Sequence, residues 1–434
     1  MVIKRYAGAL LGLRFFAALV IMLCHYGYYP LKGAGAPWPV LLLIEGRSCF
    51  TSLFFVLSGF VLGMSLAPKK FAYGDFLLKR LVKLYPLHLV CFLLVIPSDF
   101  LGPVARSTSE IVASWFFWLT MTHGFVPEYA TIFNASAWAV SSFFLGYLFI
   151  PRLLGLKSPR VLVGLAVLLV LLTLLPQVVF TQAFWAPGES YAIDIVPAHL
   201  NFFHCSPVFR LSEILLGTVL GLLVHRRLVP DWLAKAVGRD SLILACLGAI
   251  PLLFRAASQA GSPKMLSLLG HGLLLPLVLV IVVGLWYNER LLARFFGSAW
   301  MKRLGGSALL LYFLHIPISK YLLYAEGLLL GEDPKLLKAS FALFLLNASV
   351  ILVVSVLFVK PYDAACAKLL SRFSRKRGGI PAPAGASAET VIWPVPATGG
   401  RIGASRETAF LAAGEARLPP IGEPAVAPDR AGSS

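Results

Sequence analysis

Residues 6–29 read YAGALLGLRFFAALVIMLCHYGYY, an unbroken and largely apolar run. A helix needs about 20 apolar residues to cross the hydrocarbon core of a bilayer, so this run is long enough to span it. It also carries two basic side chains, Arg14 and His25. Such groups are costly inside a membrane and are candidates for function by default. The stretch therefore predicts a membrane-spanning helix with a functional polar face.

Similar apolar runs recur along the chain. Of the 434 residues, 58% are hydrophobic and only 13% are charged, whereas a soluble domain has about 25% charged residues. This composition excludes an ordinary soluble fold and excludes disorder over most of the length. We predict an all-α fold, a polytopic transmembrane helical bundle of about ten spanning helices. The predicted spans are 6–29, 41–66, 76–97, 137–151, 160–180, 207–225, 240–256, 265–287, 304–325 and 339–359.

The distribution of positive charge predicts how these helices cross the membrane. Lysine and arginine accumulate in cytoplasmic loops. With the N-terminus inside, the inner loops hold 24 of these residues and the outer loops hold 7. Both termini are therefore expected to be cytoplasmic. This arrangement requires that residues 111–122, an apolar stretch too short to span, are re-entrant or lie at the outer interface. The same bias accounts for the net charge of +18 without a nucleic-acid partner.

The composition changes after residue 377. Residues 378–434 are rich in Gly, Pro and Ala, so we expect a membrane-embedded domain over 1–377 and a disordered cytoplasmic tail over 378–434. The six cysteines are scattered without a CxxC pair, which predicts buried core residues rather than disulfides. His199 and His204 lie in one outer loop without a third ligand, so no metal site is expected.

The spacing of the two basic residues in the first predicted helix places them on the same side of that helix. Arg14 and His25 are eleven positions apart, which places them about 20° from alignment on one helix face and about 16 Å apart along the axis. A packed histidine and an arginine reaching toward the interface would explain them separately. Their alignment favours a polar path through the bundle.

Two further apolar segments contain small or basic residues that could serve either packing and anchoring or ligand binding. In SLFFVLSGFVLG, Ser58 and Gly59 fall at mid-membrane, where small residues allow close helix packing. In FLLKRLVKLYP, Arg80 and Lys83 are three positions apart at the cytoplasmic boundary. They can anchor the helix, or they can clamp a phosphate.

Later runs contain two more buried polar groups. Arg210 and Glu213, in SPVFRLSEILLGTVLG, lie one turn apart and are expected to form an ion pair. His315, in GSALLLYFLHIPI, lies at mid-depth close to Tyr312 and Pro317. A structural and a functional role for His315 are both open at this point.

Taken together and in order, six segments between residues 6 and 361 resemble the acyltransferase-3 family of integral-membrane O-acyltransferases, which includes bacterial O-antigen and exopolysaccharide acetyltransferases. They are the Arg-x10-His pattern at Arg14 and His25, FFVLSGFVLG, FLLKRLVKLYP, Trp138 to Pro151, PVFRLSEILLG and GSALLLYFLHIPI.

The resemblance implies an acyl-CoA-dependent enzyme of the bacterial inner membrane. Such an enzyme moves an acyl group, usually acetyl, from cytoplasmic acyl-CoA to a hydroxyl of a carbohydrate or lipid-linked glycan. It holds no permanent cofactor. Carried onto this chain, the catalytic residue is His25, supported by Arg14. The donor site is expected at Arg80, Lys83 and Ser58, and the acceptor side at Trp138, Arg210, Glu213, Tyr312 and His315.

The chain departs from the family pattern at three positions. Phe143 occupies the place of the usual Glu, and Lys360 stands before Pro361 where an acidic residue is common. Lys83 replaces an arginine, which keeps the charge but loses the bidentate fork. The missing Glu at position 143 weakens the transfer of acceptor-site detail from the family and leaves the first-helix pattern intact.

The expected chemistry centres on an imidazole. Histidine can act as a general base or as a transient nucleophile, and the oxyanion stabiliser stays open among Arg14, the Ser58 backbone and Arg210. A transporter or flippase for a glycan or lipid-linked substrate is the competing hypothesis, and a sensor or scaffold is a third. Dependence on acyl-CoA separates the enzyme from both. The sequence leaves the acceptor, the acyl chain length and the oligomeric state open.

Overall fold

The computed structural model describes residues 2–67, 72–100, 107–184, 202, 204–333 and 337–376, and all regular secondary structure in these ranges is helical. The all-α prediction is therefore confirmed. The first helices are α1 (Val2–Tyr26), α2 (Tyr28–Gly33), α3 (Trp38–Glu45), α4 (Arg47–Leu66), α5 (Tyr73–Phe100), α6 (Thr108–Leu119), η1 (His123–Phe125), α7 (Trp138–Leu154) and α8 (Pro159–Phe184). They are followed by α10 (Pro207–His225), α11 (Asp231–Val237), α12 (Asp240–Gln259), α13 (Pro263–Leu268), η2 (Leu269–Leu273), α14 (Leu275–Tyr287), α15 (Leu291–Phe296), α16 (Ala299–Leu330), α18 (Phe341–Leu357) and α19 (Val359–Lys376).

Within these ranges, eight helices are long and apolar enough to cross a membrane. Their spanning parts are Gly8–Tyr26, Ser48–Leu66, Tyr73–Pro97, Pro159–Ala183, Pro207–His225, Asp240–Gln259, Ala299–Leu330 and Phe341–Phe373. The chain is thus a polytopic membrane protein. The other two predicted spans correspond to shorter apolar helices, α7 with 17 residues and α14 with 13.

The predicted span 265–287 is not one continuous helix. It is divided into α13, the π-helical turn η2 and α14. Gly272 in that turn has a φ of 125°, a backbone conformation that an α-helix cannot continue and that side-chain-bearing residues avoid. The apolar composition predicted the run but could not show this interruption.

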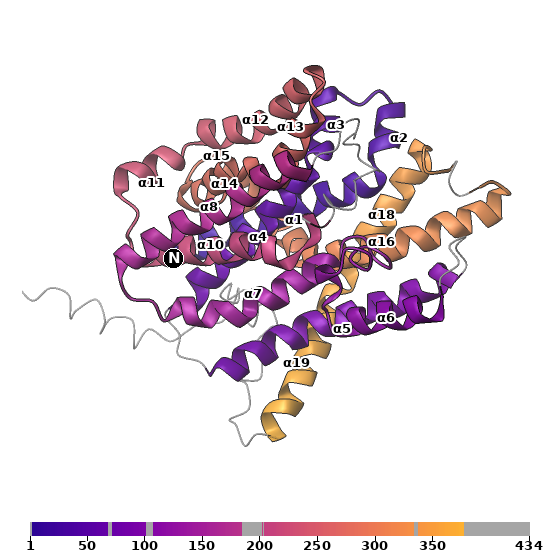
Figure 1. The fold of residues 1–434 in the computed structure, drawn as a ribbon, viewed down its shortest axis with the longest axis horizontal. Coiled ribbons are helices and arrows are strands. Elements are labelled where there is room, and N and C mark those ends of the chain that lie inside the picture. Colours follow the sequence, from indigo (N-terminus) through magenta and orange to yellow (C-terminus); the bar gives the residue numbers. More distant parts are fainter. Residues whose placement is uncertain are drawn as a thin grey trace, which may run out of the picture. The chain divides into compact units, whose positions relative to one another are not determined.

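Residues 111–122 fall largely on α6, a helix of 12 residues that begins at a capping box between Ser107 and Glu110. It is too short to cross a bilayer, which agrees with its exclusion from the predicted spans. It packs beside α5, where the Phe92 and Trp115 rings are 6.1 Å apart (Figure 1).

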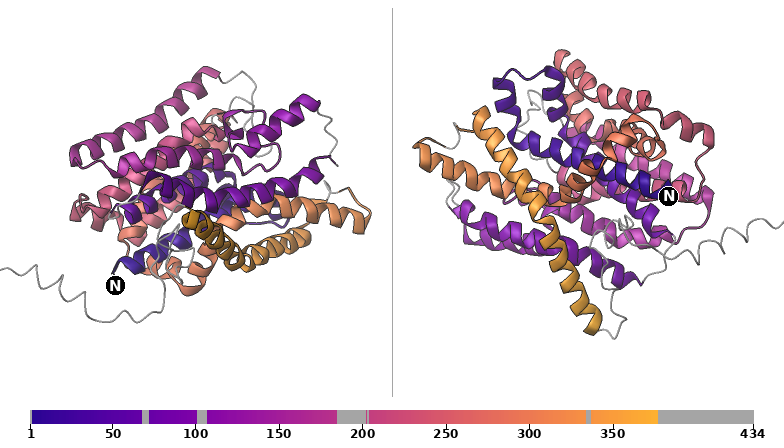
Figure 2. Two further views of the ribbon diagram at one scale, coloured as in Figure 1. Left: turned by 90° about the horizontal axis from the view of Figure 1, so that it is seen from below. Right: turned by 180° about the vertical axis from the view of Figure 1, so that it is seen from behind.

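The helices that carry the candidate site residues pack together. In Figures 1 and 2, α4 and α10 run side by side, and α1 lies against both α4 and α16. Helix α18 covers another side of α16. The interior is filled by Leu, Ile, Val and Phe side chains, and all six cysteines are buried and free, as the sequence predicted.

The neighbours of the two ends of α1 show in which direction this helix runs through the bundle. Near its start, Gly8 lies beside the Lys302 side chain at the beginning of α16. After its end, Gly27 lies beside the Phe344 ring at the beginning of α18. Arg14 is therefore nearer the Lys302 end of the bundle, and His25 is nearer the Phe344 end. The predicted tail, 378–434, lies outside the described residues.

Candidate active site

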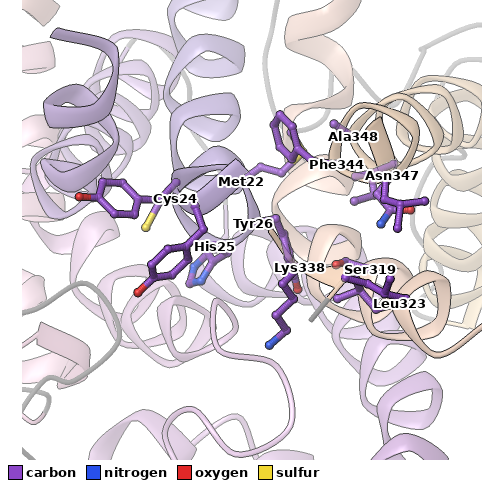
Figure 3. A pocket seen from close by; sticks show the side chains of 15 residues that line it. Met22, Cys24, His25, Tyr26, Ser319, Leu323, Lys338, Phe344, Asn347 and Ala348 are labelled. Carbon is purple, nitrogen blue, oxygen red and sulfur yellow. The ribbon is translucent and has the colours of Figure 1, made fainter. Parts of the chain in front are cut away.

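His25 lies at the end of α1 and is exposed to a cavity of about 170 Å³. The walls come from α1, α2, α16 and α18, and the polar lining includes His25, Tyr26, Ser319, Lys338 and Asn347. Figure 3 shows His25 and Tyr26 on one side of this space, with Ser319 and Asn347 across from them. A reactive imidazole therefore meets a space that can admit part of a small molecule.

His315 lies directly behind His25. The centroids of the two imidazole rings are 5.3 Å apart. The side chain of His315 is fully buried, at 0% exposure, and does not line the cavity. Its Nδ1 lies 3.0 Å from the carbonyl oxygen of Leu311. The structure places His315 in the layer beneath His25 and not on the cavity wall, and its predicted contact with substrate stays a prediction.

Arg14 is also linked to His25 through side chains of other helices. The guanidinium of Arg14, 7% exposed, lies 5.0 Å from the centre of the Phe54 ring. Phe54 stacks on Tyr312 at 5.3 Å, and Tyr312 lies 6.2 Å from His315. We call Arg14, Phe54, Tyr312, His315 and His25 the central column. This series of contacts joins the buried Arg14 to His25, which is exposed at the cavity.

Arg80 lies next to the Arg14 end of this column. It is 4% exposed, and its guanidinium carbon is 5.3 Å from the centre of the Phe76 ring. Tyr147 of α7 interacts electrostatically with both Arg80 and Arg14. Two cations buried close to one tyrosine produce a positive potential in this half of the protein.

Lys83 is placed differently from Arg80. Its ammonium forms an ion pair with Asp363 on α19 and lies 5.0 Å from the centre of the Tyr362 ring. Arg80 contacts α5 and α7 neighbours instead. The two side chains, one turn apart, therefore have different neighbours, and the phosphate clamp stays a prediction.

Arg210 and Glu213 form the expected ion pair, at 2.9 Å, and both side chains are 1% exposed. Ser52 donates to Glu213 at 2.7 Å, and Arg210 donates from Nε to the carbonyl oxygen of His204 at 2.8 Å. The guanidinium carbon also lies 5.7 Å from the centre of the Trp138 ring. Buried and cross-linked in this way, the pair joins α4, α7 and α10, and it does not line the cavity.

Ser58 is buried on α4, next to the tightest helix contact in this region. A β-carbon added to Gly59 would lie 2.0 Å from the backbone oxygen of Ile214 on α10. The close packing considered for this motif is therefore present. Ser58 does not line the cavity.

Phe143, at the position of the usual Glu, is part of an aromatic cluster. Its ring centroid lies 5.0 Å from that of Phe55, 5.9 Å from that of Phe54 and 6.2 Å from that of Tyr147. The side chain supports Phe54 of the central column by packing. An apolar residue is explained here without any catalytic role.

Several polar residues near the site had no sequence signal. Asn134 and Ser136 donate to the backbone carbonyls of Phe313 and Tyr312 beside His315. Asn347 on the cavity wall donates to Glu326 at 3.4 Å. A lone Asn or Ser in a loop is too common to single out, although a Glu inside an apolar run such as Glu326 is a signal of the kind that marks function.

The described residues hold no group of three His, Cys, Asp or Glu side chains close enough to bind a metal ion. His199 lies outside those residues, and His204 is engaged with Arg210. At the cavity, the imidazole of His25 has the imidazole of His315 behind it. Such a site can accept a proton from a hydroxyl or attack an activated acyl carbon.

An imidazole exposed to a cavity within a polytopic helical protein fits a membrane-embedded group-transfer enzyme. Residues 8–360 match a family model described as an acyltransferase domain. The chain belongs to this family, acyltransferase-3, and is an integral-membrane, multi-pass acyltransferase. The ordered motifs had predicted this membership, and it is confirmed.

Among curated proteins, the chain is similar to the acyltransferase MdmB of Streptomyces mycarofaciens. The two are 29% identical over 387 residues, which cover 84% of this chain and 92% of the relative. No solved structure gives a significant match. The comparisons thus support acyl transfer and membrane location, and they do not identify the donor or the acceptor.

Proposed function

We propose that the protein moves an acyl group, most simply acetyl, from cytoplasmic acyl-CoA to a hydroxyl of a carbohydrate or lipid-linked glycan, with His25 as the catalytic residue. The observation that carries the proposal is the position of His25. Its side chain is exposed to the cavity, and His315 of the central column lies behind it. Membership of the acyltransferase family supports the reaction class.

The proposed step balances as a simple acyl transfer. His25 takes the proton of the acceptor hydroxyl as its oxygen forms a bond to the thioester carbon. The C–S bond then breaks, and the proton passes from the imidazolium to the departing thiolate. A histidine is suited to this exchange because its ordinary pKa lies near neutral pH.

Arg80 and Arg14 are proposed to attract the donor. The diphosphate of CoA is anionic, and guanidinium groups bind phosphate oxygens through paired N–H donors. Both arginines are buried around Tyr147, nearer the Lys302 end of the bundle than the cavity is. A pantetheine arm extending from that cluster toward His25 would have to cover about 16 Å. Lys83, held by Asp363, is left outside this proposal.

We further propose that the Lys302 end of the bundle faces the cytoplasm of a bacterium and that the cavity opens toward the outer side of the inner membrane. The excess of Lys and Arg in the loops at the Lys302 end supports this orientation. Donor and acceptor would then reach His25 from opposite sides of the bilayer.

The direct test uses membranes containing wild-type protein or His25→Ala, incubated with acetyl-CoA labelled in the acetyl group. Label that depends on His25 and enters the glycan or lipid-linked glycan fraction supports the proposal. Equal labelling by both proteins removes His25 from catalysis. No label above empty membranes favours the competing transporter or flippase. A His88→Gln variant is the control, since it alters another buried histidine far from the cavity lining.

The donor site is tested separately with Arg80→Ala. The acyl-CoA concentration needed for half-maximal rate should rise more than the limiting rate falls. Lys79→Ala is the matched control, because Lys79 is the exposed cation next in sequence. Equal behaviour of the two variants would remove Arg80 from the donor site.

A further inference from the structure

His315, whose ring lies beside that of His25, has one buried ring nitrogen that can accept a hydrogen bond. A carbonyl oxygen can only accept, so the 3.0 Å contact with Leu311 requires the proton of His315 to be on Nδ1. The other nitrogen, Nε2, then carries a lone pair. It is fully buried, and no hydrogen-bond partner reaches it among the residues that the structure describes.

A buried acceptor without a partner is costly and calls for an explanation. The group closest to fitting is the imidazole of His25, whose ring centroid is 5.3 Å away. An N–H···N bond of about 2.9 Å between two imidazoles gives centroids about 5 Å apart, because each nitrogen lies about 1.1 Å from its ring centre. The observed ring separation is close to that of such a bond, and catalytic hydrogen bonds often tighten only when substrates bind.

We propose that His315 is a positioning residue, which accepts a hydrogen bond from one ring nitrogen of His25 and so turns the other, unprotonated nitrogen toward the cavity. The inference rests on the proposed catalytic role of His25 and deepens it. During transfer, His25 gains the acceptor proton, and the resulting imidazolium is stabilised by donating to Nε2 of His315. His315 keeps its own proton on Nδ1 throughout.

The surroundings of His315 support this role over direct substrate contact. Tyr26 and Tyr312 lie with their ring centroids 6.2 Å from it on two sides, and His25 lies between it and the cavity. The backbone near His315 is also held by Asn134 and Ser136. The hydrogen bond to Leu311 and the packing of these rings hold the imidazole of His315 in place. A residue that orients another side chain needs such support.

The test compares two substitutions of His315, each of which retains one of the two hydrogen-bonding functions of the imidazole. His315→Gln can place an acceptor oxygen where Nε2 was, and His315→Asn can keep only a donor to Leu311. The readout is the rate at which diethyl pyrocarbonate modifies His25 at fixed pH, followed by peptide mass spectrometry. This reaction reports the nucleophilicity of His25 and needs neither acyl donor nor acceptor.

We expect His315→Asn to slow modification of His25 about tenfold, the factor that corresponds to about one pKa unit of basicity. His315→Gln should stay within about threefold of wild type. In the labelled acetyl-transfer assay, the His315→Asn variant should lower kcat far more than it changes the KM for acetyl-CoA. The His315→Gln variant should keep a kcat much closer to that of wild type. His88→Gln replaces another buried histidine, which contacts the Trp118 carbonyl through Nε2 and does not line the cavity, and it controls for general disturbance.

Modification of His25 at the wild-type rate in all variants would overturn the inference, and so would an Asn variant that behaves as well as the Gln variant. A variant that does not fold is replaced by His315→Ser, which keeps a small polar group, with the same expectation as for Asn. Loss of the proposed function looks different. In that case, wild-type protein transfers no label, while the dependence of His25 modification on residue 315 persists.

Discussion

Asn134 donates a hydrogen bond of 2.9 Å to the carbonyl oxygen of Phe313, in the middle of α16. That carbonyl lies four residues before Pro317, which has no N–H to offer it. A loop side chain therefore completes the hydrogen bonding of a helix that carries His315 two residues later. The proline also explains why α16 has an accessible carbonyl at this depth.

Asn134→Ala should destabilise the protein by about 1–3 kcal/mol, because the buried Phe313 carbonyl loses its amide donor and keeps only the weaker Cys91 thiol, at 3.5 Å. Replacing Pro317 by Ala restores a helical N–H to that carbonyl. The penalty for losing Asn134 should then be smaller in the Pro317→Ala background. Thermal unfolding of all four proteins in detergent measures the difference. Equal penalties in both backgrounds would show that Asn134 acts elsewhere.

The sequence predicted the elements of the fold better than their contacts. Apolar runs located the spanning helices because a bilayer demands about 20 apolar residues in a row. The interruption at Gly272 follows from one backbone angle, which composition does not reveal. Among the site residues, Arg14 and His25 stood out because basic side chains are rare inside membranes.

Partners far apart in the sequence explain what could not be predicted. Asn134 and Phe313 are separated by 179 positions, and Lys83 and Asp363 by 280. No local pattern reports such pairs. From the sequence, Lys83 could anchor its helix or help to clamp a phosphate, and a structural and a functional role were both open for His315.

Lys83→Ala is expected to leave the acyl-CoA requirement close to that of wild type, in contrast to Arg80→Ala. Its ammonium pairs with Asp363, and both side chains are only partly buried. Such pairs contribute about 0–1 kcal/mol to stability. The measurement is the KM for labelled acetyl-CoA. A rise as large as that of Arg80→Ala would return Lys83 to the donor site.

Gly59→Ala should disrupt the contact between α4 and α10. The new methyl group would lie 2.0 Å from the Ile214 backbone oxygen, so the helices must move apart. Overpacking of this kind costs about 1–3 kcal/mol and sometimes more. Gly164→Ala is the matched control on α8, because nothing lies within 4 Å of its added carbon. That change should be neutral or stabilising by up to about 1 kcal/mol. Unfolding temperatures that fall equally in both variants would contradict the assignment.

The Arg210–Glu213 pair is expected to behave as a structural unit. Glu213→Leu alone leaves a buried guanidinium without its carboxylate, which costs about 3–5 kcal/mol. The double variant Arg210→Met, Glu213→Leu removes both charges and should recover much of that loss. Thermal unfolding provides the stability. A catalytic role would appear differently, as a double variant that is stable but inactive.

His123 gives the protein a predicted sensitivity to acid. Burial lowers its pKa from the ordinary value of about 6.5 to about 3, and the neighbouring His88 lowers it further, against the opposing effect of a hydrogen bond to the Ala137 carbonyl. The unfolded chain therefore binds a proton between pH 6.5 and 3 that the folded chain excludes. Stability should be fully present above about pH 6.5 and should fall by at most about 1.4 kcal/mol for each pH unit below it.

His123→Gln provides the check on this acid sensitivity. The amide can keep a donor toward the Ala137 carbonyl, and it does not titrate. The unfolding temperature of this variant should lie below that of wild type at pH 7.5, since the stacking of His123 on Trp118, at a centroid distance of 4.2 Å, is lost. Between pH 6.5 and pH 5 its unfolding temperature should then decline less steeply than that of wild type. Parallel declines of the two proteins would mean that another group binds the proton, because His123 is the only titratable side chain that differs between them.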